Sequence, residues 1–187
     1  MVKKIIAIDS QYANRVAKKM GFPHFPIKDF RDLVQKGEEV DVIETIATLV
    51  EFWVDPSESE EVATNALNRK KIRESMELQG AYVIECPSKP SQSTSSGFKH
   101  SDDQRLMITT LSRCLKLRPD FLVFVAGDGD YAPMLWELRN EGIRTEAVAD
   151  DKESFASELK RVAYNCIDLC QILTEIKQNQ TAKEEEN

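Results

Sequence analysis

The sequence predicts a single α/β domain in which a mainly parallel sheet is covered by helices on both faces. Two observations lead to this fold class. Segments typical of strands alternate with segments typical of helices along the chain, and the run FLVFVA at 121–126 is continuously apolar, like a strand buried on both faces. At 187 residues the chain is long enough for one domain with a substantial core. We expect that domain to span residues 1–173, followed by a disordered acidic tail over 174–187.

The N-terminal part predicts a strand–helix unit and then a less regular stretch. The β-branched run 3–8 indicates a strand, and 12–20 can form a helix before the Gly and Pro residues of 21–26. Residues 29–35 fit a short helix. The stretch 41–54, DVIETIATLVEFWV, is rich in β-branched and aromatic residues, so we expect its later part to be a strand.

The middle of the chain predicts a long helix over 57–80. Acidic residues lie in its first turns, basic residues follow, and Gly80 is a stop signal. Its apolar residues recur at helical spacing, and they are Val62, Ala66, Leu67, Ile72 and Met76. A strand over 81–86 comes next. The Ser- and Pro-rich stretch 87–100 is expected to be a mobile loop placed where it could cover an active site.

The C-terminal half shows the alternation most clearly. Residues 106–117 place apolar side chains on one helical face, and the buried strand 121–126 follows. Pro133 suits the first turn of a helix that ends near Gly142. The remaining expected elements are a strand over 143–149, an amphipathic helix over 155–164 and a short strand over 166–169.

Charge and composition exclude several classes of function. The net charge of −7 argues against a basic surface over the whole protein, although a local basic face for nucleic acid stays possible. No apolar run reaches the ~18 residues of a membrane span, and the N-terminus lacks a signal-peptide core, so we expect a cytoplasmic protein without membrane contact. The four cysteines are scattered and do not form a zinc motif, which predicts reduced, mostly buried thiols.

Aspartates stand directly after two of the expected strands. Asp9 follows the first strand, and Asp128 and Asp130 follow FLVFVA. Parallel sheets bind ligands beyond the carboxyl ends of their strands, so these side chains converge if the two strands are neighbours. Two carboxylates about 5 Å apart repel by roughly 3 kcal/mol at an effective dielectric near 20. Either solvent screens the pair in an exposed Asp-Gly-Asp turn, or a cation lies between them.

A further acid precedes the helix that begins near Arg105, and it is either Asp102 or Asp103. Three or four convergent carboxylates with no His or Cys among them are hard oxygen ligands, which suit Mg²⁺ or Mn²⁺. Such ions activate water and stabilise negative charge on a phosphodiester.

The run VFVAGDGDYAPMLWELRNEGIRTEAVADDKESFASELKRVAYNCIDL resembles the NYN domain, a PIN-like ribonuclease fold that includes the LabA-like proteins. The resemblance is most specific over 100–169 and is supported by IIAIDS near the N-terminus. It implies a three-layer α/β/α sandwich of the PIN-like, Rossmann-like type and a metal-dependent ribonuclease with an acidic site.

The resemblance also implies roles for particular residues. Asp9 matches the first aspartate of the family, and Asp128 and Asp130 match its Gly-Asp-x-Asp pair. In KHSDD, Asp103 is preferred over Asp102 by its spacing to the helix. The residues that the resemblance would assign to catalysis and to Mg²⁺ or Mn²⁺ binding are Asp9, Asp103, Asp128 and Asp130.

RNA contacts are expected from basic and aromatic side chains near these acids. Lys99 could face phosphate. The basic run on the 57–80 helix could neutralise phosphates or be a solvated helix face, and Lys18 and Lys19 could act likewise. Tyr131 could stack on a base or pack under its loop. The candidate RNA-binding residues are Lys99, Arg69, Lys70, Arg73 and Tyr131.

Two positions depart from the family pattern near the proposed site. Tyr12 stands where the family has asparagine, and Thr109 stands where it often has aspartate. The leading expectation is an endoribonuclease that cleaves RNA. A homodimer of the protein could build a longer track for the RNA. The alternative is a catalytically degenerate NYN domain that binds RNA or protein in a regulatory role, and a phosphate-ester hydrolase with the same acids is a third reading.

Overall fold

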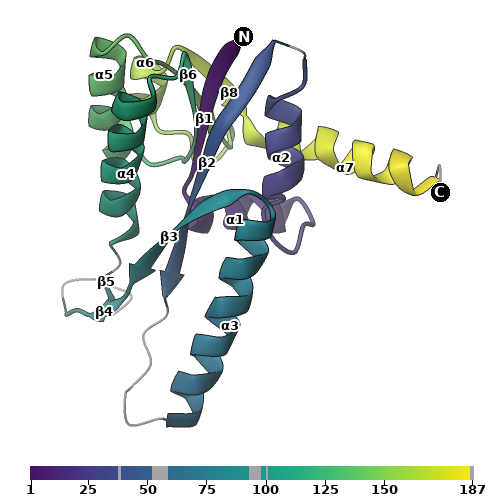
Figure 1. The fold of residues 1–187 in the computed structure, drawn as a ribbon, viewed down its shortest axis with the longest axis vertical. Coiled ribbons are helices and arrows are strands. Elements are labelled where there is room, and N and C mark those ends of the chain that lie inside the picture. Colours follow the sequence, from purple (N-terminus) through teal and green to yellow (C-terminus); the bar gives the residue numbers. More distant parts are fainter. Residues whose placement is uncertain (38, 52–58, 93–97, 100, 186–187) are drawn as a thin grey trace.

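The computed structural model describes residues 1–37, 39–51, 59–92, 98–99 and 101–185, and it contains a six-stranded parallel sheet (Figure 1). The strand order is β3-β2-β1-β6-β7-β8. The strands are β1 (Val2–Ile8), β2 (Val40–Glu51), β3 (Ala81–Pro87), β6 (Phe121–Val125), β7 (Arg144–Ala149) and β8 (Asn165–Asp168). The α/β fold class predicted from the sequence is confirmed.

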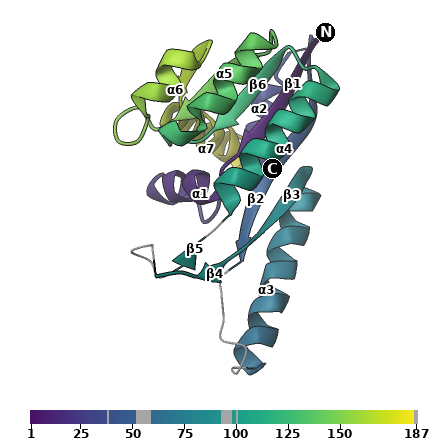
Figure 2. The same cartoon turned by 90° about the vertical axis from the view of Figure 1, so that its left-hand side faces the viewer.

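Helices cover both faces of the sheet. One face carries α1 (Ser10–Lys19), α2 (Ile27–Val34) and α7 (Leu169–Glu185). The opposite face carries α4 (Asp102–Leu117), α5 (Ala132–Asn140) and α6 (Ser157–Val162). The long helix α3 (Ser59–Leu78) lies against the edge strand β3 and extends beyond the sheet, away from the other helices (Figures 1 and 2).

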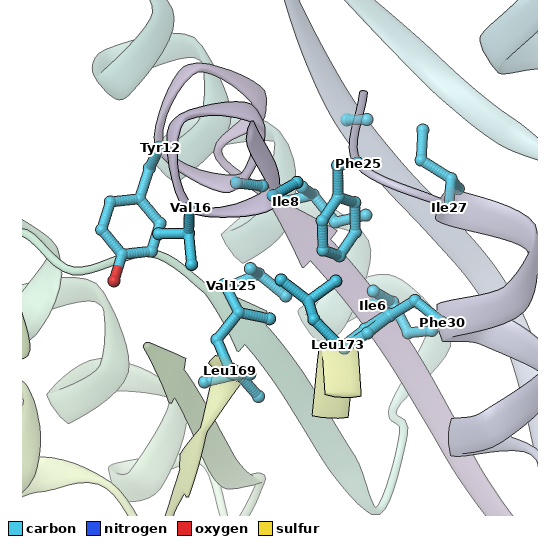
Figure 3. Packing of buried hydrophobic residues seen from close by; sticks show 14 of the residues in the cluster. Ile6, Ile8, Tyr12, Val16, Phe25, Ile27, Phe30, Val125, Leu169 and Leu173 are labelled. Atoms are coloured by element: carbon cyan, nitrogen blue, oxygen red, sulfur yellow. The ribbon is translucent and has the colours of Figure 1, made fainter. Parts of the chain in front are cut away.

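The side chains of β1 alternate between two hydrophobic clusters. Ile6 and Ile8 belong to the cluster that includes residues of α1, α2 and α7, whereas Ile5 and Ala7 belong to the cluster under α4, α5 and α6. Figure 3 shows the first cluster, in which Ile6 and Ile8 lie among side chains of several helices. Residues 5–8 of β1 are buried on both faces of the sheet, which explains why this part of the strand is continuously apolar.

The chain reverses direction across the sheet beside β1. It runs from β1 outward to β2 and β3 and then returns to β6 on the other side of β1. Ile8 pairs with Ala47 on one side and with Val125 on the other, both in parallel register. The backbone N–H of Asp9 donates to the carbonyl of Val125 at 3.0 Å. In sheets of this order, such a reversal opens a crevice at the carboxyl ends of the strands.

Two expectations about helices differ from the structure. The helix over 57–80 is observed as α3, but of its apolar residues Val62, Leu67 and Ile72 are exposed and Met76 is buried, because only the C-terminal part packs on the sheet. The tail expected to be disordered from residue 174 is helical to Glu185, because Leu173 and Ile176 are buried in the first cluster.

Smaller differences concern two connecting segments. Within the stretch expected as a loop over 87–100, β4 (Lys89–Pro90) pairs with β5 (Phe98–Lys99) in an antiparallel hairpin, while 93–97 and residue 100 lie outside the described residues. The helix expected over 155–164 is shorter, because α6 begins at Ser157 and ends at Val162. Across the described residues, every helix is too short or too polar to cross a membrane.

Candidate functional site

Asp9 lies at the junction of β1 and α1. It is the N-cap of α1, and its Oδ1 accepts a hydrogen bond from the backbone N–H of Tyr12 at 3.1 Å. Burial raises the pKa of Asp9 from 3.8 to about 6; the Tyr12 N–H opposes this shift, and the charges of Asp103 and Asp102 add to it. Asp9 is therefore a carboxylate whose negative charge is poorly compensated by the protein itself.

Asp103 approaches Asp9 from the first turn of α4, and Tyr131 connects the two. The phenol of Tyr131 donates to Oδ1 of Asp103 at 2.6 Å and lies 3.4 Å from Oδ2 of Asp9. A hydroxyl has one hydrogen, and the shorter contact to Asp103 takes it. Oδ2 of Asp9 is left with only a long contact, which is consistent with its raised pKa. Asp102, the neighbouring candidate, is buried.

Tyr131 is not placed for stacking on a base. Its side chain is 1% exposed, and its ring packs edge-on against Phe124 with centroids 4.9 Å apart. Burial, followed by the charge of Asp9 and the hydrogen bond to Asp103, raises the pKa of Tyr131, so the phenol stays protonated and remains a donor. Of the two roles considered from the sequence, the structure gives this residue the packing role.

Asp128 and Asp130 follow β6 in an exposed turn. Oδ1 of Asp128 accepts the backbone N–H of Asp130 at 3.0 Å and so caps the short 3₁₀ helix Gly129–Tyr131. Both carboxylates are exposed, so solvent screens their repulsion. The turn chemistry considered from the sequence is therefore present at the same place as the candidate ligands.

The four aspartates lie near the carboxyl ends of the central strands, and their oxygen atoms are ligands that suit a hard cation. All are carboxylate oxygens, and the crowding of negative charge around Asp9 is what a divalent ion would relieve. They do not form a group of three ligand atoms within 4.8 Å of one another in the described part of the chain. Asp9 and Asp103, which share Tyr131, are the pair that the structure brings together.

A different group of ligand atoms meets that distance criterion. Atoms of Asp150, Asp168 and Cys170 lie within 4.8 Å of one another. Oδ1 of Asp168 also accepts the backbone N–H of Cys170 at 3.1 Å. This group was not among the residues predicted from the sequence, although Asp150 directly follows β7 and Asp168 ends β8. The rule that located Asp9 would have located them too.

Tyr12 supports the loop after β7. Its side chain is buried, and its hydroxyl lies 3.0 Å from Oγ of Ser154 and accepts the backbone N–H of Asp150 at 2.8 Å. Its ring lies so close to Gly127 that an added Cβ there would be 2.5 Å from Cε2. Tyr12 thus holds the loop after β7 through its hydroxyl, and its ring lies beside Gly127, just before the acidic turn.

The basic candidates on α3 are ion-paired. Arg69 contacts Glu51 at 2.7 Å, Lys70 contacts Glu74 at 3.8 Å, and Arg73 contacts two glutamates at 2.7 and 2.8 Å. Exposed pairs of this kind contribute about 0–1 kcal/mol, so they can exchange for other anions. The side chain of Lys99 lies outside the described residues.

Comparison with solved structures gave a similar fold in one bacterial protein and a weaker likeness to a second. A protein of unknown function from Vibrio parahaemolyticus superposes with a TM-score of 0.65 at 15% identity, covering 90% of this chain and 93% of that one. MurG from Acinetobacter baumannii gives a TM-score of 0.47 at 14% identity over 90% of this chain and 41% of that one. The comparison with curated proteins gave no match.

The family comparison is more specific. The family model described as NYN domain matches residues 4–170, which include both strands of the central crevice and all four candidate aspartates. This family lies within the PIN-like nuclease superfamily. The resemblance read from the acidic turn and the strands around it is confirmed, and the chain belongs to the NYN domain family.

Proposed function

We propose that this protein is an endoribonuclease that depends on Mg²⁺ or Mn²⁺. One observation carries the proposal: Asp9 and Asp128 follow two adjacent parallel strands at the point where the chain reverses across the sheet. The membership of the NYN family supports the reaction class, because its superfamily consists of PIN-like nucleases.

In this proposal the acidic side chains hold the ion. The metal ligands and catalytic residues would be Asp9, Asp103, Asp128 and Asp130. The ion supplies activation of water and stabilisation of charge on the phosphodiester. Tyr131 holds Asp103 in place through the 2.6 Å hydrogen bond, and Asp9 is oriented by its cap on Tyr12 N–H. Phosphates of the RNA would contact the basic residues Arg69, Lys70, Arg73 and Lys99.

The variant Asp128→Asn tests the proposal. Asparagine retains an oxygen that can cap the turn at Asp130, so the fold is expected to persist while one carboxylate is lost. Cleavage of single-stranded RNA in Mn²⁺ or Mg²⁺ should be abolished in Asp128→Asn and preserved in the control Asp32→Asn, which lies on α2. Equal cleavage by wild type and Asp128→Asn would overturn the proposal.

A second candidate function is an RNA- or protein-binding module without catalysis. The observation that favours it is the Tyr131 hydroxyl, which donates to Oδ1 of Asp103 and so already satisfies one of the carboxylate oxygens that a cation would bind. Titration with Mn²⁺ separates the two functions. A rise in melting temperature on adding Mn²⁺ supports the nuclease, whereas no thermal response together with no cleavage of several RNAs supports the binding module.

A further inference from the structure

A groove runs between α1 and α3 beside the Asp9 site. Its cavity measures about 810 Å³, and residues 48–51 at the end of β2 line it together with the two helices. A second cavity of about 260 Å³ adjoins it. Residues common to both cavities are Ser10, Asn14, His24, Ile72 and Met76. We call the combined feature the α1–α3 groove.

The charge of the α1–α3 groove is opposite to that of the protein. The larger cavity is lined by Arg15, Lys18, Lys19 and Arg69, with Glu51 as its acidic residue, while the whole chain carries −7. Lys19 pairs with Glu153 and Arg69 with Glu51. Arg15 and Lys18 form no ion pair among the described residues; Arg15 stacks over the ring of Tyr12, with its guanidinium carbon 5.4 Å from the centroid. A local cationic surface on an acidic protein fits a polyanion.

Ser10 is a buried polar residue in the lining of the groove. It is 9% exposed, lines both cavities and directly follows Asp9. Its backbone N–H donates to Oγ1 of Thr48 at 3.1 Å, but its own Oγ is buried and has no hydrogen-bond partner among the described residues.

The opposite wall of the groove is apolar and amide-rich. Ile72 is 47% exposed and Met76 is buried, and Asn65 and Asn68 lie on the same helix and line the larger cavity. The helix α3, which carries Ile72, extends past the sheet (Figure 2). An unpaired base has apolar faces and a polar edge, which such a wall can contact together. In a duplex the bases are stacked and paired, so they cannot enter a groove of this kind.

We propose that the α1–α3 groove binds a single-stranded segment of RNA next to the Asp9 site. Phosphates contact Lys18 and Arg15, and a base lies against Ile72 and the amides of α3. The groove thereby adds a binding track, built from α1 and the protruding α3, to the catalytic acids. This inference rests on the proposed function for the class of nucleic acid, but it concerns binding and needs no catalysis.

The test measures binding without metal, so that the RNA stays intact. Fluorescence anisotropy with a fluorescein-labelled oligouridylate in EDTA compares Lys18→Glu and Ile72→Glu with two matched changes on α4, Lys116→Glu and Ile108→Glu, where Ile108 is also exposed. We expect each groove variant to weaken binding by about tenfold. In Lys18→Ala, the slope of the logarithm of the binding constant against the logarithm of the salt concentration should also become shallower by about 0.7. This is the value for one phosphate contact on a single strand. The α4 variants should bind like wild type.

Several outcomes separate the groove from the nuclease proposal. Loss of binding in the groove variants, with wild type failing to cleave RNA in Mn²⁺, supports the groove and removes the nuclease. Unchanged binding in Lys18→Glu and Ile72→Glu, with wild type cleaving RNA, overturns the groove and keeps the nuclease. Binding of a fully paired duplex as tightly as the oligouridylate also overturns the groove, because it would show that unpaired bases are not recognised. Equally tight binding of polyglutamate overturns it too, because that polyanion has neither bases nor phosphates.

Discussion

The phenol oxygen of Tyr131 lies 2.6 Å from Oδ1 of Asp103, although 28 residues separate the two in sequence. The same oxygen is 3.4 Å from Asp9, which is 122 residues away from Tyr131. One buried hydroxyl therefore connects carboxylates that follow β1 and begin α4. The geometry of the acidic site depends on this residue as well as on the acids.

Replacing Tyr131 by phenylalanine tests that dependence. Tyr131→Phe keeps the ring against Phe124 but leaves Oδ1 of Asp103 without its donor and removes the long contact to Asp9. We expect the free energy of unfolding in EDTA to fall by about 1–3 kcal/mol, the range for loss of a hydrogen bond to a charged group. Urea denaturation measures the loss. Tyr164→Phe, at an exposed tyrosine, serves as the control and should change stability by less than about 0.5 kcal/mol. Equal effects of the two variants would contradict the role given to the Tyr131 hydroxyl.

The raised pKa of Asp9 predicts how stability depends on pH. The folded protein holds the Asp9 proton more tightly than the unfolded chain, whose value is near 3.8, so stability falls as the pH rises from about 4 to about 6. The difference between the pKa of Asp9 in the folded protein and in the unfolded chain lowers the free energy of unfolding by up to about 3 kcal/mol above pH 6, at 1.36 kcal/mol for each pKa unit. Asp9→Asn keeps an oxygen for the Tyr12 cap and removes the charge.

The variant Asp9→Asn should therefore be more stable than wild type at neutral pH. The gain should reach about 1–3 kcal/mol in EDTA and should vanish below about pH 4, where both states of wild type are protonated. Urea denaturation at several pH values gives the difference directly. A gain that stays constant with pH would show that charge at Asp9 is not its cause.

Sequence patterns located the acids but not the group that joins them. Asp9 and Asp128 could be placed together because parallel strands bring their carboxyl ends to one edge of the sheet. The contact of Tyr131 with Asp103 could not be predicted, because the direction of its side chain depends on the 3₁₀ turn that Asp128 caps. Asp150 and Asp168 obeyed the same strand-end rule, but neither belongs to the Gly-Asp-x-Asp motif that drew attention to the first pair.

The packing of two helices could likewise be predicted only in part from the sequence. Helical spacing identified α3 correctly, but spacing alone does not show whether a surface exists for the apolar side to pack against. Val62, Leu67 and Ile72 are exposed for that reason. For α7 the prediction gave too little structure, since a disordered tail was expected where the helix continues. The acidic composition of the last residues concealed the helical spacing of Leu169, Leu173 and Ile176.

Gly127 should not tolerate a larger residue. A Cβ at this position would lie 2.1 Å from the carbonyl oxygen of Ser154 and 2.5 Å from the Tyr12 ring, and both are fixed by hydrogen bonds of the Tyr12 hydroxyl. We expect Gly127→Ala to lower the free energy of unfolding by about 1–3 kcal/mol through overpacking. The comparison is Gly129→Ala, two positions along, where the nearest atom to an added Cβ is a side-chain oxygen of Glu158 at 3.1 Å. Thermal denaturation should show a larger loss for Gly127→Ala, and the reverse order would contradict the close packing against Tyr12.

The packing of α7 predicts that residues beyond 174 contribute to stability. Ile176 is 2% exposed in the cluster that α7 shares with α1 and α2, and Gln180 donates to Asp29 of α2 at 2.8 Å. Truncating a buried isoleucine to alanine removes apolar contacts and leaves a cavity, so Ile176→Ala should cost about 2–5 kcal/mol. Gln178→Ala, at an exposed position of the same helix, should stay within about 0.5 kcal/mol. Urea denaturation of both variants decides between a docked helix and a disordered tail, because a tail would make the two substitutions equally harmless.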